Sequence, residues 1–176
     1  MLKQYGAYYC DTIEELYDVT KMLAFHGPIM GKRLLAIETS GGLGIIACDE
    51  SERAGLEMPE VSDERKVQLR KDLPAHAVLR TWIDIVSMDP DSFIKVAQTG
   101  VADDYDMVLL IFGDPVVRAG EIVAAYKKRT DKPIFVAFSG GGEVEKHEWP
   151  LIQAQGVPVF PSVERAMAYF RLRPRK

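Results

Sequence analysis

The sequence predicts an α/β fold, a doubly wound parallel sheet of about five strands flanked by helices. Short, near-continuous apolar stretches, such as residues 34–38 and 107–112, alternate along the chain with longer segments of helical periodicity. Strands buried on both faces appear as unbroken apolar runs, and their alternation with helices is typical of βαβ units. Right-handed crossovers then place helices on both faces of the sheet, which makes the expected class flavodoxin-like.

The first element is a helix that precedes the sheet. Asp11 or Thr12 can cap its start, acidic residues follow in its first turn, and Gly27-Pro28 ends it. We therefore expect an N-terminal helical arm over residues 1–31, followed by one domain over residues 32–176.

The later elements follow from the same start and stop signals. Gly55 can end a helix, Ser62 and Asp89-Pro90 can begin one, and Gly113 and Ser139-Gly140 can end strands. The elements expected in order are strand 34–38, helix 45–53, an extended segment or short strand at 55–59, helix 62 to about 73, strand 83–86, helix 89 to about 100, strand 107–112, helix 117–129, strand 133–138, helix 143–155, strand 157–160 and helix 162–172.

Composition excludes several classes of protein. The 176 residues suit one domain, and the formal net charge of −4 gives no electrostatic basis for binding nucleic acid. No apolar run is long enough to cross a membrane, and the N-terminus lacks the pattern of a signal peptide. Cys10 and Cys48 lie far apart without metal-ligand spacing, so we expect a reduced, cytoplasmic protein without a metal site.

In a doubly wound sheet the ligand crevice lies beyond the carboxyl ends of the strands. Four loops are expected there: 39–44, 84–87, 113–115 and 139–142. Two of them hold adjacent glycines between a strand and a helix, where backbone N–H groups and the helix dipole can bind an anion. We interpret the first loop as a phosphate or anion site made by Thr39, Ser40, Gly41, Gly42 and Gly44. The alternative is that these glycines only satisfy tight turns.

Known nucleotide fingerprints do not fit this first loop. S-G-G-L-G breaks the G-x-G-x-x-G spacing, and no G-K-[ST] follows it. Catalytic candidates are also scarce, because His26, His76 and His147 have no context that indicates catalysis. Asp84 and Asp114 are better placed, although an aspartate that ends a strand often only binds neighbouring N–H groups.

The order of several motifs resembles the NDP-forming acyl-CoA synthetases, relatives of succinyl-CoA synthetase. The resemblance is to the C-terminal CoA-ligase domain of the subunit that binds CoA and carries the phosphohistidine. The family's segments are an I-E-E-L-Y-D-V-like helix, T-N-x-G-G-x-G, A-G-L-x-x-P-x-[LV]-S, L-R-x-x-L-P, D-K-P-[IV] and G-[IV]-P-V-[FY]-P-[ST]-x-E-R-A. Their counterparts here are residues 13–19, 39–44, 54–62, 69–74, 131–134 and 156–166.

The resemblance implies a supporting role for this chain within a larger enzyme. It implies that the helix after the glycine loop points at a phosphohistidine on a partner domain, and that the other loops face the acyl substrate or acyl phosphate. The residues on that acyl side would be Asp84, Ser87, Gly113, Asp114, Ser139, Gly140 and Gly141. No residue of this chain would be catalytic by itself.

The implied reaction joins a small carboxylic acid to CoA at the expense of ATP or GTP. CoA and the nucleotide would bind in the complete enzyme, with no cofactor held tightly here. The implied partners are CoA-binding and phosphohistidine domains and an ATP-grasp domain or subunit.

Some positions depart from the family pattern. Ser40 replaces asparagine, Thr81-Trp82-Ile83-Asp84 replaces N-P-[VIL]-D, and Asp114 replaces the second of two glycines. These departures leave a second hypothesis, a stand-alone, non-catalytic regulatory module that binds an anion or acyl-CoA.

Overall fold

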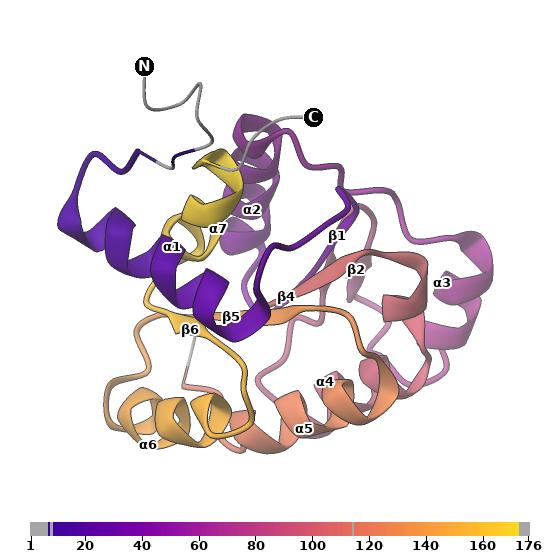
Figure 1. The fold of residues 1–176 in the computed structure, drawn as a ribbon. Helices are drawn as coiled ribbons and strands as arrows, with labels where there is room; N and C mark the ends of the chain where they lie inside the picture. Colours follow the sequence, from indigo (N-terminus) through magenta and orange to yellow (C-terminus); the bar gives the residue numbers. More distant parts are fainter. Residues whose placement is uncertain (1–6, 8, 114, 173–176) are drawn as a thin grey trace.

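The computed structural model describes residues 7, 9–113 and 115–172, which form a six-stranded sheet between two layers of helices (Figure 1). The order of the strands in the sheet is β2-β3-β1-β4-β5-β6, and only β2 runs antiparallel to its neighbour. Without β2, the remaining five strands have the flavodoxin-like order 2-1-3-4-5. The predicted fold class is therefore confirmed, with one additional edge strand. The strands are β1 Leu34–Glu38, β2 Val78–Leu79, β3 Ile83–Asp84, β4 Met107–Phe112, β5 Ile134–Phe138 and β6 Val159–Phe160.

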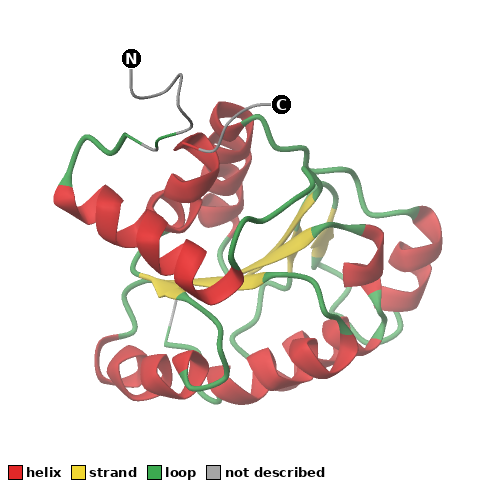
Figure 2. Ribbon diagram, in the orientation of Figure 1, coloured by secondary structure: helices red, strands yellow, loops and turns green. Residues whose placement is uncertain are grey.

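Seven α-helices cover the two faces of this sheet among the described residues (Figure 2). One face packs against α1 Ile13–His26, α2 Gly41–Ala54 and α7 Val163–Leu172, while the other faces α3 Asp63–Leu69, α4 Pro90–Gln98, α5 Ala119–Arg129 and α6 Gly142–Gln153. A short 3-10 helix, Val101–Asp104, precedes β4. Side chains of a strand point alternately to its two faces, so Leu34 joins the first core and Leu35 the second. Every residue of β1 and β4 is buried, as their apolar runs predicted.

Helix α1 is held against α7 by a buried ion pair. The Asp18 carboxylate is 2% exposed and accepts two hydrogen bonds from Arg165, at 2.6 and 2.8 Å. The Tyr169 hydroxyl also accepts the N–H of Ile29 at 2.9 Å. The sequence predicted this helix with its Thr12 cap, which accepts the N–H of Glu15. The division into an arm of residues 1–31 and a domain of residues 32–176 stays a prediction.

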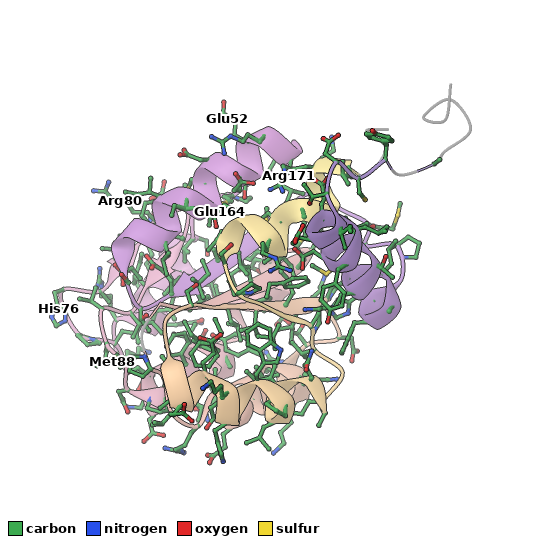
Figure 3. All side chains as sticks on the ribbon, turned by 90° about the vertical axis from the view of Figure 1, so that its left-hand side faces the viewer. Glu52, His76, Arg80, Met88, Glu164 and Arg171 are labelled. Atoms are coloured by element: carbon green, nitrogen blue, oxygen red, sulfur yellow. The ribbon has the colours of Figure 1, made fainter. Side chains whose placement is uncertain are left out.

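A second ionic contact joins α7 to α2. Glu50, buried in α2, binds both Arg53 of its own helix and Arg171 of α7. Figure 3 shows Arg171 and Glu164 on α7, next to the helix that carries Glu52. Helices α1, α7 and α2 therefore form one connected layer, and α2 is fixed in place above the sheet.

Several predicted boundaries were wrong. Helix α2 begins at Gly41 and not at residue 45, because Ser40 is extended (φ −144°) and the glycines adopt helical geometry in the first turn. Of the two forms expected for residues 55–59, the short strand is absent, and an isolated bridge joins Arg33 to Glu57. The helix expected to reach about residue 73 ends at Leu69.

The edge of the sheet near β3 also differs from the prediction. The strand predicted at 83–86 ends at Asp84, because Val86 takes a left-handed backbone conformation (φ 51°). The antiparallel strand β2 was not predicted from the sequence.

Candidate functional site

The carboxyl ends of β1 and β4 form the point where the chain connections diverge. The chain leaves β1 for α2 on one face of the sheet and leaves β4 for α5 on the other (Figure 1). In flavodoxin-like sheets ligands bind at this switch point. The candidate site is therefore the start of α2 and the loops beside it.

The predicted loops lie in a row along this edge. A Cβ placed on Gly113 would lie 3.4 Å from Ser40 Cβ, and one placed on Gly140 would lie 3.9 Å from the Gly113 carbonyl oxygen. On the other side, a Cβ on Gly41 would lie 3.1 Å from Asp84 Oδ2. The structure therefore brings the first loop next to the second and third, and the third next to the fourth.

Other predicted site residues are engaged locally. The Ser87 hydroxyl accepts the N–H of Asp89 at 3.1 Å, and the Ser139 N–H donates to the Phe112 carbonyl at 2.9 Å. The Gly141 N–H donates to Glu145 of its own helix. Thr39 is buried at the end of β1, and Asp114 lies outside the described residues. The roles assigned to these residues stay predictions.

Three helices that begin at this edge, α4, α5 and α6, have carboxylates at their N-termini. Asp89 accepts N–H groups at the start of α4, and Glu145 accepts that of Gly141 at the start of α6. The buried carboxylate of Glu148 accepts the N–H groups of Arg118 and Gly120 at the start of α5. These helix ends are already neutralised by the chain itself.

Helix α2 has one such contact, from the Ser40 N–H to Glu38 Oε2, but otherwise begins differently. Its N-cap residue, Ser40, makes no capping hydrogen bond with its side chain, and no acidic residue occupies its first turn. The N–H groups of Gly41 and Gly42 have no acceptor within the helix. No atom lies within 4 Å of the place where a Cβ of Gly42 would be, so this side of the first turn is open. The start of α2 thus has the donors and the space to receive an anion.

Glu38, the last residue of β1, was not predicted as a site residue. Its carboxyl group is fully buried, and Oε2 accepts the Ser40 N–H at 2.9 Å. Burial, together with the nearby charge of Asp84, raises the pKa of Glu38 from 4.5 to about 7, against the N–H donors of Ser40, Trp82 and Gly44. The sequence offered one signal, an acidic residue that ends an otherwise apolar run.

Gly44 gives the Glu38 side chain its space. A Cβ at this position would lie 2.7 Å from Glu38 Oε1 and 2.5 Å from Trp82 Nε1. Both atoms are buried and neither makes a well-formed hydrogen bond, although the N–H groups of Trp82 and Gly44 lie close enough to oppose the rise in the pKa of Glu38. Trp82 packs against the core between the sheet and α2, as expected of a packing residue, and also lines this cluster.

Counted from Thr39, the glycine loop is one residue shorter than T-N-x-G-G-x-G. When the glycines are aligned, Gly41, Gly42 and Gly44 match, and Glu38 takes the position of the pattern's threonine. This alignment replaces the one that started from Thr39. In this alignment Glu38 and Trp82 both depart from the pattern, and a Cβ on Gly44 would meet both side chains.

Asp84 lies beside Glu38 and shapes the next loop. It is the Cα partner of Glu38 in the parallel pairing of β1 with β3, and it is 6% exposed. Its Oδ1 accepts the N–H of Val86 at 2.8 Å and so holds the left-handed turn. Asp84 therefore binds a neighbouring N–H group, as anticipated, while its other oxygen faces Gly41.

His26 lies away from this edge, whereas His76 comes two residues before Val78, the strand partner of Asp84, and His147 lies 3.6 Å from the Glu148 carboxylate that caps α5. His26 contacts the Ile134 carbonyl at 2.8 Å, and burial lowers its pKa. His76 and His147 are exposed, with His76 on the connection before β2 (Figure 3). Among the described residues, no group of three or more His, Cys, Asp or Glu side chains could hold a metal ion.

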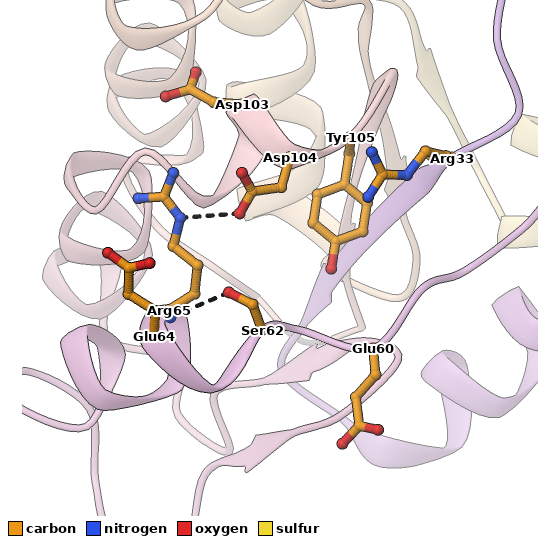
Figure 4. A pocket seen from close by; sticks show the side chains of 8 residues that line it. All are labelled: Arg33, Glu60, Ser62, Glu64, Arg65, Asp103, Asp104 and Tyr105. Atoms are coloured by element: carbon orange, nitrogen blue, oxygen red, sulfur yellow. Dashed lines mark hydrogen bonds and ion pairs between the residues drawn. The ribbon is translucent and has the colours of Figure 1, made fainter.

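A polar pocket of about 470 Å³ opens at the opposite, amino-terminal edge (Figure 4). Arg65 and Asp104 form an ion pair at 2.9 Å there, and Arg33 lies over the Tyr105 ring at 5.8 Å. These groups satisfy one another, so the pocket does not compete with the start of α2 as an anion site.

Comparison with known proteins agrees with this fold. No protein-family model matches the sequence. The chain is 27% identical over 176 residues to a trans-feruloyl-CoA synthase from an unknown prokaryotic organism. It is 26% identical over 177 residues to the alpha subunit of ADP-forming acetate–CoA ligase II from Pyrococcus furiosus. Each match covers 94% of this chain, but only 25% and 38% of the relatives.

A solved structure shares the fold. It is the dinucleotide-forming acetyl-coenzyme A synthetase 1 of Candidatus Korarchaeum cryptofilum in complex with phosphate and ADP, with a TM-score of 0.83 at 24% identity. The match covers 97% of this chain and 38% of that one.

These findings show that the chain is similar to one part of several larger CoA ligases. Its homologues are NDP-forming acyl-CoA synthetases, and it matches a domain of the alpha subunit of the ADP-forming acetyl-CoA synthetases. The resemblance stated from the sequence motifs is therefore confirmed. The chain spans well under half the length of the curated relatives described above.

Proposed function

We propose that this chain is a domain or subunit of an NDP-forming acyl-CoA synthetase, which makes an acyl-CoA from a carboxylic acid, CoA and ATP or GTP. Its part is to receive and stabilise a phosphoryl group that partner domains supply. The observation that carries this proposal is the start of α2, which lies at the switch point of the sheet with an open first turn and no side-chain cap.

The N–H groups of Gly41 and Gly42 would bind the phosphoryl oxygens of a phosphohistidine or an acyl phosphate. The helix dipole contributes about half a positive charge at this end, so no cationic side chain is required. Donors fixed before the reaction stabilise developing charge more effectively than water, which must reorient. The chain holds the phosphoryl group in place and contributes no nucleophile.

The neighbouring loops would face the acyl group. Val86, Met88 and Val117 are exposed apolar residues in the loops that follow β3 and β4. Apolar side chains next to an anion site suit a substrate with a carboxylate at one end and an apolar group at the other. We therefore extend the acyl side proposed for Asp84, Ser87, Gly113 and Ser139 to include these three residues.

The proposed partners are a CoA-binding domain, a phosphohistidine domain and an ATP-grasp domain or subunit. CoA and the nucleotide would bind on those parts, in the cytoplasm. Among the described residues, no helix is long and apolar enough to cross a membrane.

A stand-alone regulatory module that binds an anion or acyl-CoA is the second candidate. The buried carboxyl group of Glu38 favours it, because a carboxylate next to an anion site weakens binding when it is charged. The two candidates differ in whether product formation depends on this chain.

Reconstitution distinguishes them. The chain is mixed with separately produced CoA-binding, phosphohistidine and ATP-grasp polypeptides, together with CoA, ATP and candidate acids, and acyl-CoA is measured. We expect acyl-CoA to form only when this chain is present. Equal product formation without the chain would rule out the enzyme role and favour the regulatory module.

A further inference from the structure

The first turn of α2 covers a buried oxygen atom that has no hydrogen-bond partner. Glu38 is fully buried, and although its Oε2 accepts the Ser40 N–H, its Oε1 accepts no hydrogen bond. Oε1 lies 2.7 Å from the position that a Cβ of Gly44 would occupy, on the inner side of the helix. A buried carboxyl oxygen without a donor is costly when the group is charged and much less so when it is protonated.

Among the described residues, no cation offsets a negative charge at this position. The groups that act on Glu38 are the carboxylate of Asp84 on β3, the N–H donors of Ser40 and Gly44 in and before α2, and the indole of Trp82. The nearby thiol of Cys48 in α2 has a raised pKa, in part because of Glu38, and Ile111 is the apolar neighbour on β4. Glu38 thus differs from the buried Asp18, which is paired with Arg165.

An anion at the start of α2 would add a further negative charge to this cluster. Gly41 lies between the proposed anion and Asp84 Oδ2, and Ser40, the residue just before Gly41, donates to Glu38. The carboxyl groups of Glu38 and Asp84 therefore lie beneath the N–H groups that would bind the anion, and both repel it when they are charged. Neutralising one of them removes much of this repulsion without changing the fold.

We propose that the start of α2 binds an anion only while the carboxyl group of Glu38 is protonated, so that anion binding is coupled to proton uptake. This inference rests on the proposed function, because it concerns the same helix end. It makes Glu38 a positioning residue that sets the charge beneath the phosphoryl group without touching it.

The expected signature is a loss of affinity with rising pH. Because the pKa of Glu38 is raised to about 7, a large share of the protein molecules carry a proton on Glu38 near neutral pH. If one proton is required, the affinity falls by about tenfold for each pH unit above that pKa. Below it, the affinity is constant and binding takes up no proton.

Sulfate is the appropriate probe, because it keeps both negative charges throughout this range, whereas phosphate changes its own charge near neutrality. Sulfate binding is measured by titration calorimetry between about pH 5.5 and about pH 8.5. Two buffers of different ionisation enthalpy at each pH give the number of protons taken up per sulfate. This measurement needs no variant.

Glu38→Gln keeps the shape of the side chain and removes its charge. It should bind sulfate with equal affinity at all these pH values and take up no proton. The matched control is Glu143→Gln, an exposed residue in the first turn of α6 at the same edge of the sheet. That variant should keep the pH dependence of the wild type.

The outcomes separate this inference from the proposed function. Wild-type binding that does not change with pH and takes up no proton would overturn the coupling and leave the anion site intact. Absence of sulfate binding at every pH in both the wild type and Glu38→Gln would overturn the anion site as well. Binding that weakens with pH equally in Glu38→Gln would assign the proton to another group and so contradict the inference.

Discussion

Glu38 and Asp84 are direct neighbours in the parallel pairing of β1 with β3, and both carboxyl groups are buried. Two like charges at adjacent strand ends repel each other, and burial weakens their hydration. The pair lies directly under the helix end that we propose as the anion site, so its charge state influences both stability and binding.

Stability should therefore depend on pH through Glu38. Its folded pKa is raised, so the folded state holds more protons than the unfolded state between pH 4.5 and about 7, and stability falls as pH rises through that window. The loss is on the order of 2 to 3 kcal/mol. Glu38→Gln should not lose this stability as the pH rises. The measurement is urea unfolding of the variant and the wild type at several pH values in this range, and the difference between their unfolding free energies should change with pH.

The unfolding free energy of the wild type is subtracted from that of Glu38→Gln because His26 titrates in the same pH range and has the opposite effect on stability. Its lowered pKa makes stability rise as pH increases toward 6.5, and it does so equally in both proteins. A difference between the two curves that stays constant with pH would show that Glu38 is charged at all these pH values.

Glycine at position 44 should be required by packing. The Cβ of Gly44→Ala would lie 2.5 Å from Trp82 Nε1, so the indole must move, at a cost of about 1–3 kcal/mol. Gly42→Ala is the matched control in the same turn, because no atom lies near its Cβ position. It should gain up to about 1 kcal/mol, as alanine favours the helix. Equal effects of the two substitutions on thermal unfolding would refute this packing argument.

The sequence predicted the strands that run through the middle of the sheet better than its edge. Residues 34–38 and 107–112 are unbroken apolar runs, and β1 and β4 have those bounds. Strand β2 has only two residues, too few to give a pattern. The start of α2 was placed too late because paired glycines are typical of loops, whereas here they form a first helical turn.

The candidate site was predicted only in part, for a physical reason. The row of strand-end loops follows from topology, and Asp84 and Gly113 lie where that rule placed them. Glu38 was missed because the contact between a strand end and a neighbouring strand depends on register, which one sequence does not reveal. The closeness of Trp82 to Glu38 is likewise visible only in three dimensions.

The Asp18–Arg165 pair should hold α1 in place. Arg165→Met leaves the buried Asp18 carboxylate without its cation, which costs about 3–5 kcal/mol. Adding Asp18→Asn should recover part of this loss, since the buried charge is then gone. Lys66→Met is the control on an exposed pair with Glu60, and its cost should be far smaller because solvent screens the pair. Urea unfolding gives the stability of the wild type, the two single variants and the double variant. If the double variant is no more stable than Arg165→Met, the unpaired charge of Asp18 is not the cause of the loss.

Val86 should carry backbone strain. A β-branched residue at φ 51° is unfavourable, and the side chain is 44% exposed, so little packing is lost on its removal. Val86→Gly should raise the unfolding free energy by about 1 kcal/mol, whereas Val117→Gly, at an equally exposed site without positive φ, should lower it. Calorimetric melting compares the two, and destabilisation of similar size in both would exclude strain at Val86.

The most direct test of the anion site is the rate of acyl-CoA formation by the reconstituted enzyme with Gly42→Leu in this chain. A Cβ in a helix tilts toward the N-terminus, so this side chain would extend over the open N–H groups, where space exists and the fold is unaffected. Loss of one preorganised donor lowers the rate by roughly 100- to 1000-fold. We predict a fall of that size for Gly42→Leu and a near wild-type rate for Gly42→Ala, whereas an unchanged rate with Gly42→Leu would contradict the claim that α2 receives the phosphoryl group.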